Sequence, residues 1–240
     1  MIKYSRHPEK YPLEVRFKKV QILIRKALKA LNVTLEEEGV KDILSGPAGK
    51  VGKFLVCNHT SLTDPLYFIA ISEKPITFVC KKEVRKLPFV GRIVKIIEGV
   101  FLDREDLKAE LKTFLEVSKA LKEKPELNWL VYAEGTRNKG DLRSVLEFKH
   151  GTFKFPMKAE SDIVVCSCVG AYRVISTKIK GKYQIVNLKM DKVFKKEEYD
   201  DYSTNELAKL CQTYCLDGVK EMFDTNEKRF KELNTKKKKA

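Results

Sequence analysis

A histidine and an aspartate, separated by four residues, form the pair in this chain best suited to move a proton. His59 and Asp64 lie between an apolar stretch at 54–57, which predicts a buried strand, and another at 65–71, which predicts a helix. Open α/β sheets place their chemistry at such junctions. Hydroxyl residues between the two are helix-capping types and favour a tight turn. Such a turn would bring the Asp64 carboxylate back onto the His59 ring.

This pair predicts a general base. A carboxylate bonded to one imidazole nitrogen fixes the tautomer and leaves the other nitrogen free to accept a proton. The chain has no G-x-S-x-G segment, so a serine nucleophile on a strained turn is not expected, and the base would activate a hydroxyl of the substrate itself. The alternative is that His59 caps the helix and Asp64 is a solvated acid. His150 lies in a basic turn and Cys57 in an apolar strand, so neither replaces His59 as the expected catalytic group.

Polar side chains also follow three other predicted strands. Lys81 and Lys82 come after 76–80, Asp103 and Arg104 after 99–102, and the segment Glu134-Gly135-Thr136-Arg137 after 129–132. In a parallel sheet these ends share one rim, so the groups are expected to converge near His59. The fork of an arginine matches phosphate oxygens, and a glycine lets the backbone approach a ligand closely. The alternative is that these are surface salt bridges, each of little energetic value.

The elements that must position these groups alternate along the chain. Strands are expected at 33–43, 54–57, 76–80, 99–102, 129–132, 163–166 and 183–188, and helices at 13–32, 65–71, 93–97, 105–123 and 206–223. The helix at 105–123 is expected to turn Leu107, Leu111, Phe114, Leu115 and Leu121 inward. Such alternation predicts an α/β fold with a mostly parallel central sheet flanked by helices.

The first of these helices is amphipathic and basic. Phe17, Val20, Ile24 and Leu28 share one face, and Arg16, Lys18, Lys19 and Arg25 add positive charge around it. We expect Phe17, Val20, Ile24, Leu28, Lys18, Lys19 and Arg25 to contact an anionic membrane surface; the alternative is that the apolar face packs on the core. The expected organisation is a helical segment at 1–45, a catalytic domain at 46–225 and a basic tail at 226–240.

Several segments, taken in order, resemble the glycerolipid acyltransferases, above all 1-acyl-glycerol-3-phosphate acyltransferases. They are His59-x4-Asp64, the stretch 78–83, Leu87-Pro88-Phe89-Val90-Gly91, Gly99-Val100-Phe101-Leu102-Asp103-Arg104, Glu134-Gly135-Thr136-Arg137 and the stretch 148–153. Each is weak alone, and their combination in this order over about residues 50–170 is specific. The sequence departs from the family pattern at Ala133 and Asn138, where proline and serine are common, and at 164–166, where a proline is missing.

The resemblance implies transfer of a fatty acyl group from an acyl-CoA or acyl-carrier-protein thioester to a lysophospholipid hydroxyl, with no metal and no covalent acyl-enzyme. His59 would be the base and Asp64 would hold its ring. The acceptor's phosphate would be bound by Lys81, Arg104, Glu134, Gly135, Thr136 and Arg137, with Glu134 ordering Arg137 or the glycerol. Glycerol-3-phosphate or another lysophospholipid remains open as the acceptor.

Composition agrees with an anionic partner. Lys and Arg outnumber Asp and Glu by 48 to 33, a formal net charge of +15. Nucleic acid is the alternative partner, but the chain shows no recognisable nucleic-acid-binding motif. The six cysteines lack metal-ligand spacing, which favours free thiols in a reducing compartment. The polar N-terminus is unlike a signal peptide, and no apolar run reaches the roughly 18 residues of a membrane span. We therefore expect a cytoplasmic protein, peripheral on the inner face of the membrane.

Overall fold

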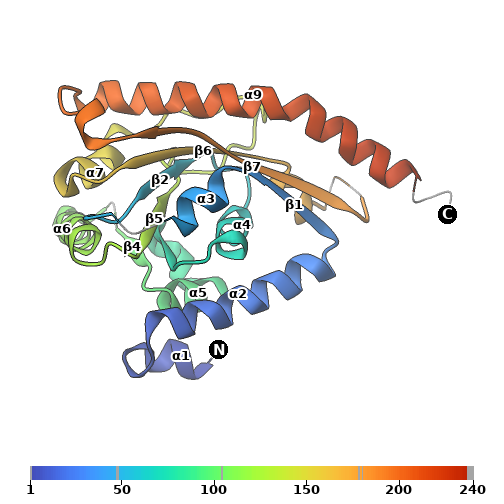
Figure 1. Ribbon diagram of the computed structural model, residues 1–240. Coiled ribbons are helices and arrows are strands. Elements are labelled where there is room, and N and C mark those ends of the chain that lie inside the picture. The colour runs from blue at the N-terminus through green and yellow to red at the C-terminus, as the bar shows by residue number, and fades with distance from the viewer. Residues whose placement is uncertain (1, 47–48, 104, 178, 180, 237–240) are drawn as a thin grey trace.

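A seven-stranded sheet with helices on both faces forms the frame of the molecule (Figure 1). The computed structural model describes residues 2–46, 49–103, 105–177, 179 and 181–236. The strands lie in the order β1-β7-β6-β2-β5-β3-β4. Their bounds are β1 Val33–Glu38, β2 Phe54–Cys57, β3 Ile76–Lys81, β4 Val100–Leu102, β5 Asn128–Val131, β6 Ile163–Val169 and β7 Gln184–Phe194.

The strands that precede the candidate site residues all run in the same direction. β6, β2, β5, β3 and β4 are mutually parallel, whereas β7 pairs antiparallel with β6 and parallel with β1. The predicted α/β fold with a mostly parallel sheet is therefore confirmed. The carboxyl ends of the five parallel strands form one rim, with β2 between β6 on one side and β5, β3 and β4 on the other.

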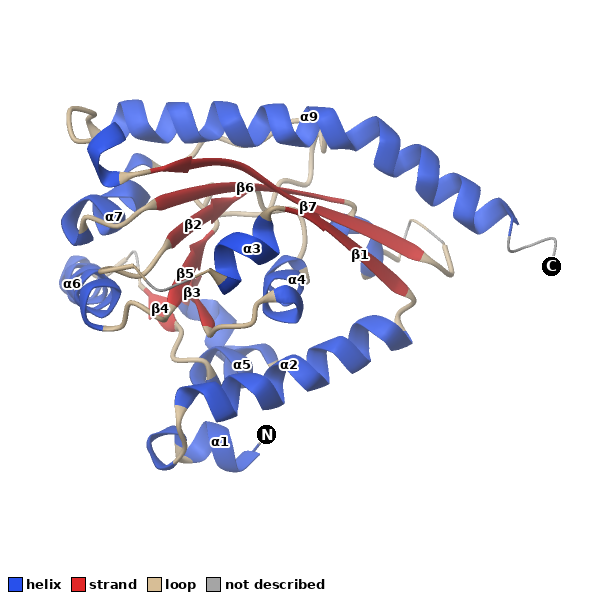
Figure 2. Cartoon of the chain, viewed as in Figure 1, coloured by secondary structure: helices blue, strands red, loops and turns tan. Residues whose placement is uncertain are grey.

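Helices cover both faces of the sheet (Figure 2). The α-helices are α1 Ile2–Arg6, α2 Leu13–Ala30, α3 Val40–Ser45, α4 Asp64–Ile71, α5 Val90–Ile96, α6 Leu107–Glu123, α7 Lys154–Ala159, α8 Ala171–Val174 and α9 Thr204–Lys236. Short 3-10 turns occupy Pro8–Lys10, Lys82–Lys86, His150–Phe153 and Lys196–Glu198. Within the described part of the chain, every helix is too short or too polar to span a bilayer.

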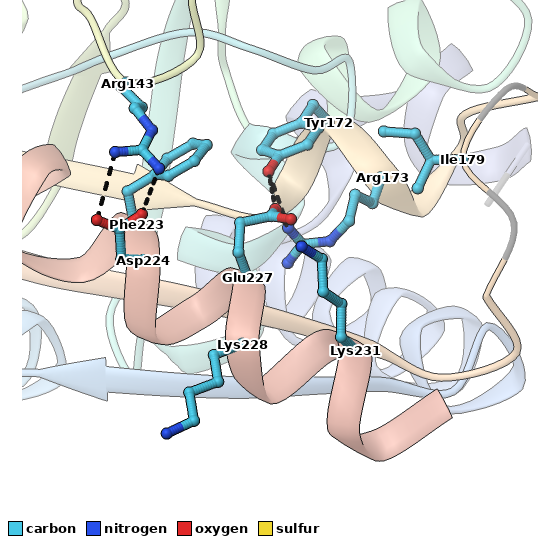
Figure 3. Close-up of a pocket in the computed structure, with 9 residues that line it drawn as sticks. All are labelled: Arg143, Tyr172, Arg173, Ile179, Phe223, Asp224, Glu227, Lys228 and Lys231. Atoms are coloured by element: carbon cyan, nitrogen blue, oxygen red, sulfur yellow. Dashed lines mark hydrogen bonds and ion pairs between the residues drawn. The ribbon is translucent and has the colours of Figure 1, made fainter. Parts of the chain in front are cut away.

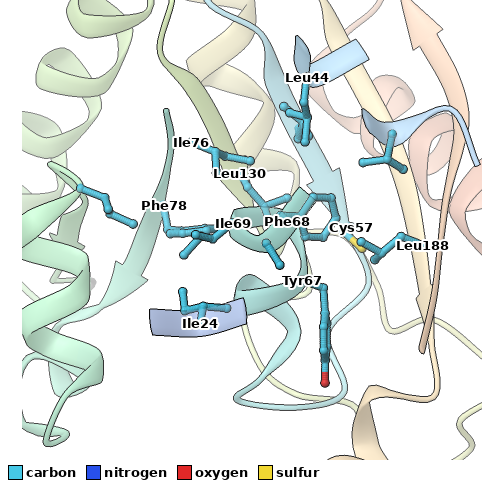
Figure 4. Close-up of a cluster of buried hydrophobic side chains, with 14 of the residues drawn as sticks. Ile24, Leu44, Cys57, Tyr67, Phe68, Ile69, Ile76, Phe78, Leu130 and Leu188 are labelled. Atoms are coloured by element: carbon cyan, nitrogen blue, oxygen red, sulfur yellow. The ribbon is translucent and has the colours of Figure 1, made fainter. Parts of the chain in front are cut away.

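Strand β2 is buried on both sides, which explains why its four residues are all apolar. Leu55 and Cys57 join the core formed with α2, α3 and α4, whose side chains interdigitate in Figure 4. Phe54 and Val56 join the opposite core, which contains side chains of α6, α7 and α9. Successive strand residues point to opposite faces, so an uninterrupted apolar run is what a central parallel strand requires. The turn that begins at Asn58, directly after β2, therefore starts from a strand that is packed on both faces.

The prediction that the apolar stripe of α2 faces a membrane is wrong. Phe17, Val20, Ile24 and Leu28 are buried in the core shared with α4, so they are not available to lipid. The Gln21 amide also donates to the Ile69 carbonyl at 2.8 Å. One apolar stripe cannot face both lipid and core, and the strongly apolar α4 provides the partner it needs.

The charged residues of this helix divide between two environments. Lys18 and Lys19 are exposed. Arg25 is exposed and its Nε donates to the Ala70 carbonyl at 2.7 Å, at the end of α4. Arg16, expected among the solvated charges, is buried and forms an ion pair with Glu98 at 2.5 Å. The helix is therefore fastened to α4 and α5 by polar contacts as well as by its apolar face.

Element boundaries correct four other expectations. The strand expected at 33–43 ends at Glu38, because Gly39 adopts a left-handed φ of 72° and α3 begins at Val40. The strand expected at 183–188 is longer, because β7 continues from Gln184 to Phe194. The tail expected from 226 begins inside α9, which continues to Lys236. On α6, Leu107, Leu111 and Leu115 are exposed rather than inward, since Thr113, Val117 and Leu121 supply the buried face.

Candidate functional site

The turn between β2 and α4 brings the His59 ring and the Asp64 carboxylate together. His59 Nδ1 lies 2.7 Å from Asp64 Oδ2. The same oxygen accepts the backbone N–H groups of Thr60 at 2.8 Å and Ser61 at 2.9 Å. Asp64 is fully buried and begins α4, with Pro65 next in the helix. One carboxylate oxygen therefore shapes the turn and orients the imidazole, as the spacing of the two residues predicts.

This geometry leaves one edge of the imidazole chemically available. A carboxylate can only accept, so Nδ1 carries the ring proton and Nε2 keeps its lone pair. The Tyr132 ring stacks on the imidazole at a centroid distance of 4.2 Å and an interplanar angle of 19°. The His59 side chain keeps 18% of its surface exposed, whereas that of Asp64 keeps none. The arrangement can remove a proton from a group that approaches Nε2.

Glu134 is buried against the backbone of the His59–Asp64 turn, which corrects the expectation that it binds phosphate. Its side chain is only 2% exposed, and Oε1 accepts the backbone N–H of His59 at 2.8 Å. Burial raises the pKa of this carboxyl to about 7, against the lowering effect of the backbone N–H groups of His59 and Leu146. A carboxyl group buried in this place holds the backbone of His59 and has almost no surface left to contact a ligand.

Glu134→Gln tests this burial through stability. The raised pKa means that the folded state binds a proton more tightly than the unfolded chain between about pH 4.5 and 7. The free energy of unfolding of the wild type therefore falls as the pH rises through this window, and glutamine, which never ionises, removes that loss. We expect the variant to gain up to about 3 kcal/mol on the wild type between pH 5 and pH 8, measured by urea denaturation.

The control for Glu134→Gln is the exposed Glu116→Gln, which removes a carboxylate from the surface of α6. Parallel stability profiles for the wild type and Glu134→Gln would refute the assignment of Glu134 as a buried carboxyl with a raised pKa.

The loop after β5 folds over the turn and completes its support. The backbone N–H of Asn138 donates to the His59 carbonyl at 2.7 Å. The Asn138 side chain donates to the carbonyls of Asp141 at 2.8 Å and Ser144 at 3.0 Å. Gly135 has a φ of 68°, in the left-handed region that favours glycine. Asn138, one of the departures from the family pattern, thus orders the loop that carries Arg137.

The remaining rim residues differ in whether their side chains form contacts with other residues. Arg137 is half-buried and Lys81 exposed, and neither side chain forms a hydrogen bond or ion pair with the residues described. Thr136 is exposed. Lys82 is bound to Asp103 at 3.0 Å. Sheet order places β5 and then β3 beside β2, so Arg137 and Lys81 lie along the same rim as His59.

Arg104, expected to bind phosphate with Lys81 and Arg137, lies outside the described residues. Its neighbour Asp103 follows the edge strand β4, and the hydrogen bond from Lys82 chiefly lowers the pKa of the Asp103 carboxyl. At the β4 end of the rim, Asp103 and Lys82 form an ion pair.

Sequence reasoning missed two groups around His59, namely Asn58 and Tyr132. The buried Asn58 side chain accepts the Cys168 N–H at 2.7 Å and donates to its carbonyl at 2.9 Å, which fastens the start of the turn to β6. Asn58 directly precedes the His59 motif and Tyr132 lies two residues before the Glu134 segment, but their contacts join segments distant in the sequence. Only adjacency to the motifs could have pointed to them.

The competing candidates lie elsewhere or are inert. His150 is exposed and 3.5 Å from the Thr204 hydroxyl. Burial raises the pKa of the Cys57 thiol well above its usual range, which keeps it protonated. Among the described residues, no three His, Cys, Asp or Glu side chains are grouped to hold a metal ion. His59 is therefore the histidine that the fold combines with a buried acid partner, whereas His7 lies 3.5 Å from Glu9 with both side chains exposed.

Comparisons with known proteins agree with this arrangement. A profile of the acyltransferase family matches residues 36–170. The chain is 33% identical over 175 residues to a protein of Mycoplasma pneumoniae named probable 1-acyl-sn-glycerol-3-phosphate acyltransferase, covering 70% of this chain and 61% of that one. It is 34% identical over 121 residues to the 1-acyl-sn-glycerol-3-phosphate acyltransferase of Helicobacter pylori, covering 48% of this chain and 49% of that one. The aligned region thus spans about half to three fifths of these relatives.

The fold also has a counterpart among solved structures. The crystal structure of the 1-acyl-sn-glycerophosphate acyltransferase from Thermotoga maritima superposes with a TM-score of 0.67 at 24% sequence identity, covering 86% of this chain and 79% of that one. The profile match includes β2, the His59–Asp64 turn and the 134–137 segment. This chain therefore belongs to the acyltransferase family.

Proposed function

We propose that the protein moves a fatty acyl group from an acyl thioester to the free hydroxyl of 1-acyl-glycerol-3-phosphate, giving phosphatidic acid. The observation that carries the proposal is the contact of His59 Nδ1 with Asp64 at 2.7 Å, on a rim that also carries Lys81 and Arg137. The relatives from Mycoplasma pneumoniae and Helicobacter pylori are named as 1-acyl-sn-glycerol-3-phosphate acyltransferases, which supports this acceptor. A base beside free cations suits an alcohol that also bears a phosphate.

In the proposed mechanism His59 acts twice. Its Nε2 removes the proton from the acceptor hydroxyl while that oxygen attacks the thioester carbonyl carbon. The buried Asp64 carboxylate stabilises the imidazolium that forms. When the tetrahedral intermediate collapses, the C–S bond breaks and the imidazolium returns the proton to the leaving thiolate. The products are the new ester and a free thiol, and His59 regains its starting tautomer.

Arg137 and Lys81 would bind the acceptor's phosphate, together with Arg104. Two of these cations are without protein partners among the described residues, so no existing ion pair has to break for a phosphate to enter. Holding the phosphate would fix the distance between the hydroxyl and Nε2, an orientation effect that can exceed proton transfer in size.

Arg137→Ala is expected to raise the KM for the lysophospholipid about 10- to 100-fold and to change kcat much less, because it removes a contact to a part of the substrate remote from the reacting bond. Steady-state kinetics with varied acceptor at saturating donor measure both constants. The control is Lys139→Ala, an exposed cation two residues along the same loop. A fall in kcat at unchanged KM would place Arg137 in the chemistry instead of in phosphate binding.

The proposed partner surface is an anionic bilayer, and it would meet the outer side of α2. Val15, Ile22 and Leu23 are exposed there, with Lys18, Lys19 and Lys26 exposed around them. Apolar side chains among lysines suit the interface of a membrane rich in anionic lipid. In this proposal the membrane contacts the face of α2 opposite the buried stripe, and the protein acts as a peripheral enzyme on the inner face of the membrane.

A single assay tests the function. Purified protein is mixed with phosphatidylglycerol vesicles that contain 1-acyl-glycerol-3-phosphate, and thiol release from acyl-CoA or acyl-carrier protein is followed. We expect release that depends on the acceptor, a phosphatidic acid product, and sedimentation with anionic but not with phosphatidylcholine vesicles. Parallel reactions with glycerol-3-phosphate and with neutral lysophospholipids identify the acceptor. Thiol release without acceptor, or none with any pair of substrates, would overturn the proposal.

A further inference from the structure

An aromatic ring is held in solvent on the short segment between β3 and α5. Phe89 is 72% exposed, and its neighbours Leu87 and Pro88 are exposed as well. This turn, residues 87–89, comes after Lys81 at the carboxyl end of β3 and after the 3-10 turn Lys82–Lys86, and it leads directly into α5. A single exposed apolar side chain is ordinary on a protein surface, but Phe89 also has an unusual backbone conformation.

The backbone at Phe89 forms a γ-turn with positive φ. Its φ is 64° and its ψ is −50°, and the Val90 N–H donates across it to the Pro88 carbonyl at 2.7 Å. This form of γ-turn is rare and strained, and a bulky residue at positive φ is an outlier. Glycine would adopt the same conformation at lower cost. Phenylalanine is therefore unfavourable here for the backbone and for solvation alike, and strain of this kind is kept where function requires it.

The 87–89 turn is fastened to the elements beside it, so Phe89 is held outward. The Gly91 N–H donates to the Leu87 carbonyl at 3.1 Å, and the Ile93 N–H donates to the Phe89 carbonyl at 2.8 Å. Gly91 lies so close to the backbone of Arg85 that a side chain at this position would collide with the Arg85 carbonyl. The ring could fold back onto the protein surface only if these contacts were broken.

Positive charge surrounds the exposed turn. Residues 81–95 contain six lysines and arginines and a single acid, Glu83. Arg85, Lys86 and Arg92 are exposed, and none of them forms an ion pair within the described part of the chain. Apolar side chains among unpaired cations suit the interface of an anionic bilayer, where an aromatic ring lies at the level of the headgroups and the cations lie near lipid phosphates.

The apolar tip of this turn is too small for a protein partner. It consists of Leu87, Pro88 and Phe89, whereas a stable protein interface buries about 800 Å² on each partner. A bilayer requires no such area, because one ring can insert while the cations are attracted to the surface potential. The neighbouring elements favour the same partner. α5 packs against α1 and α2, and the three helices lie together along one side of the molecule (Figure 1).

We propose that the 87–89 turn inserts Phe89 into the interface of an anionic bilayer and thereby holds the β3 end of the rim at the bilayer surface. Its effect on catalysis rests on the acyltransferase function proposed above. Lys81, in the same short segment, would meet the phosphate of an acceptor that is still partly in the bilayer. The turn takes no part in the chemistry. It determines how efficiently a membrane-borne acceptor is supplied and leaves the transfer step to His59.

Phe89→Trp tests the insertion directly. The chain contains one tryptophan, Trp129, which is 2% exposed in β5, so a change in emission on addition of vesicles comes from position 89. We expect the emission to shift to shorter wavelength with phosphatidylglycerol vesicles and to be quenched by lipids brominated near the headgroup. Phosphatidylcholine vesicles should give little of either effect. Unchanged emission with vesicles that sediment the protein would overturn the insertion and leave α2 as the contact.

Two replacements of the ring test its contribution to binding. Phe89→Ser should lower the partition into phosphatidylglycerol vesicles about 10- to 100-fold, because it removes a large apolar side chain from the interface. Phe89→Gly should weaken the partition as much without lowering the melting temperature, because glycine relieves the strained turn. The control is Tyr202→Ser, which removes an exposed aromatic ring just before α9 and should bind vesicles as the wild type does. Wild-type partition of both Phe89 variants would overturn the proposal.

Kinetics with two acceptors separate this inference from the function on which it rests. For Phe89→Ser we expect the KM for vesicle-borne 1-oleoyl-glycerol-3-phosphate to rise at least about tenfold, while kcat and both constants for the water-soluble 1-hexanoyl analogue stay unchanged. Equal changes for both acceptors would overturn the proposal, because the turn would then act on the site itself. A wild type that transfers no acyl group to any acceptor would refute the proposed function, and the fluorescence and partition measurements would still decide whether Phe89 inserts.

Discussion

Replacing His59 with alanine should lower kcat for acyl transfer by about 10²–10⁴-fold, which is the contribution expected of a positioned general base. The imidazole is bonded through Nδ1 to Asp64, and Nε2 is the basic atom left for the acceptor hydroxyl. The imidazole ring is partly exposed. When the ring is removed, the backbone N–H groups of Thr60 and Ser61 still donate to Asp64. The fold should therefore survive, and the melting temperature should move little.

The matched control for this variant is His150→Ala. His150 is exposed and belongs to the same family-like part of the sequence, but no carboxylate among the described residues orients it. Its replacement should leave kcat within about twofold of wild type, since surface substitutions away from special features have small effects. If His59→Ala kept most of its activity in a purified assay, proton removal by His59 would be refuted. Retained far-UV circular dichroism is needed to show that a loss of activity is not a loss of fold.

Replacing Asp64 with asparagine should lower kcat by about 10²–10⁴-fold while most of the stability remains. Asparagine can keep an oxygen where Oδ2 accepts the N–H groups of Thr60 and Ser61. It has no negative charge, however, so the imidazolium formed in the reaction would lose its counter-charge. Kinetics at saturating donor and acceptor, together with thermal unfolding, measure the two effects separately.

Asp64→Ala serves as the contrast, because it removes the acceptor as well as the charge. Two backbone N–H groups of the turn would lose their partner, at a cost of about 1–3 kcal/mol for each that stays buried and unpaired. We therefore expect Asp64→Ala to lower the melting temperature as well as kcat. Wild-type kcat in Asp64→Asn would show that the carboxylate only builds the turn, and that the charge on it has no part in transfer.

The contact between His59 and Asp64 could be predicted because it depends on residues that are close together in the sequence. An apolar strand, a turn of capping residues and an apolar helix are all read from consecutive residues, and the short turn between them is enough to return Asp64 to His59. The rim was predictable for a related reason. Parallel strands place their carboxyl ends on one edge, so the order of elements in the chain already groups Lys81 and Arg137 with His59.

Glu134 and the first helix were misjudged because burial depends on partners far away in the sequence. Glu134 follows a strand as Arg137 does, and nothing in the four-residue segment shows that one carboxylate turns beneath His59 while the guanidinium stays outside. The apolar stripe that contains Phe17 and Ile24 could pack against lipid or against the protein core. In the structure it packs against α4 in the core. Helical periodicity identifies the apolar face of a helix, but it does not determine which surface that face packs against.

The pocket between the turn after β6 and α9 shows most clearly what the sequence does not predict (Figure 3). Arg143, Tyr172 and Lys231 are separated by long stretches of chain, and no motif connects them. They meet because α9 crosses the sheet above the carboxyl end of β6, a path that is visible only in the folded chain (Figure 1).

The amino-acid sequence by itself determined the α/β class, the histidine-aspartate turn and the cationic rim, because strand and helix periodicity and strand-end chemistry are carried by neighbouring residues. Tertiary structure alone decided which side of α2 faces outward, that Glu134 supports the backbone of His59, and that Arg143, Tyr172 and Lys231 line one pocket. Those features arise from contacts between segments distant along the chain, where packing and desolvation, and not local pattern, select the arrangement.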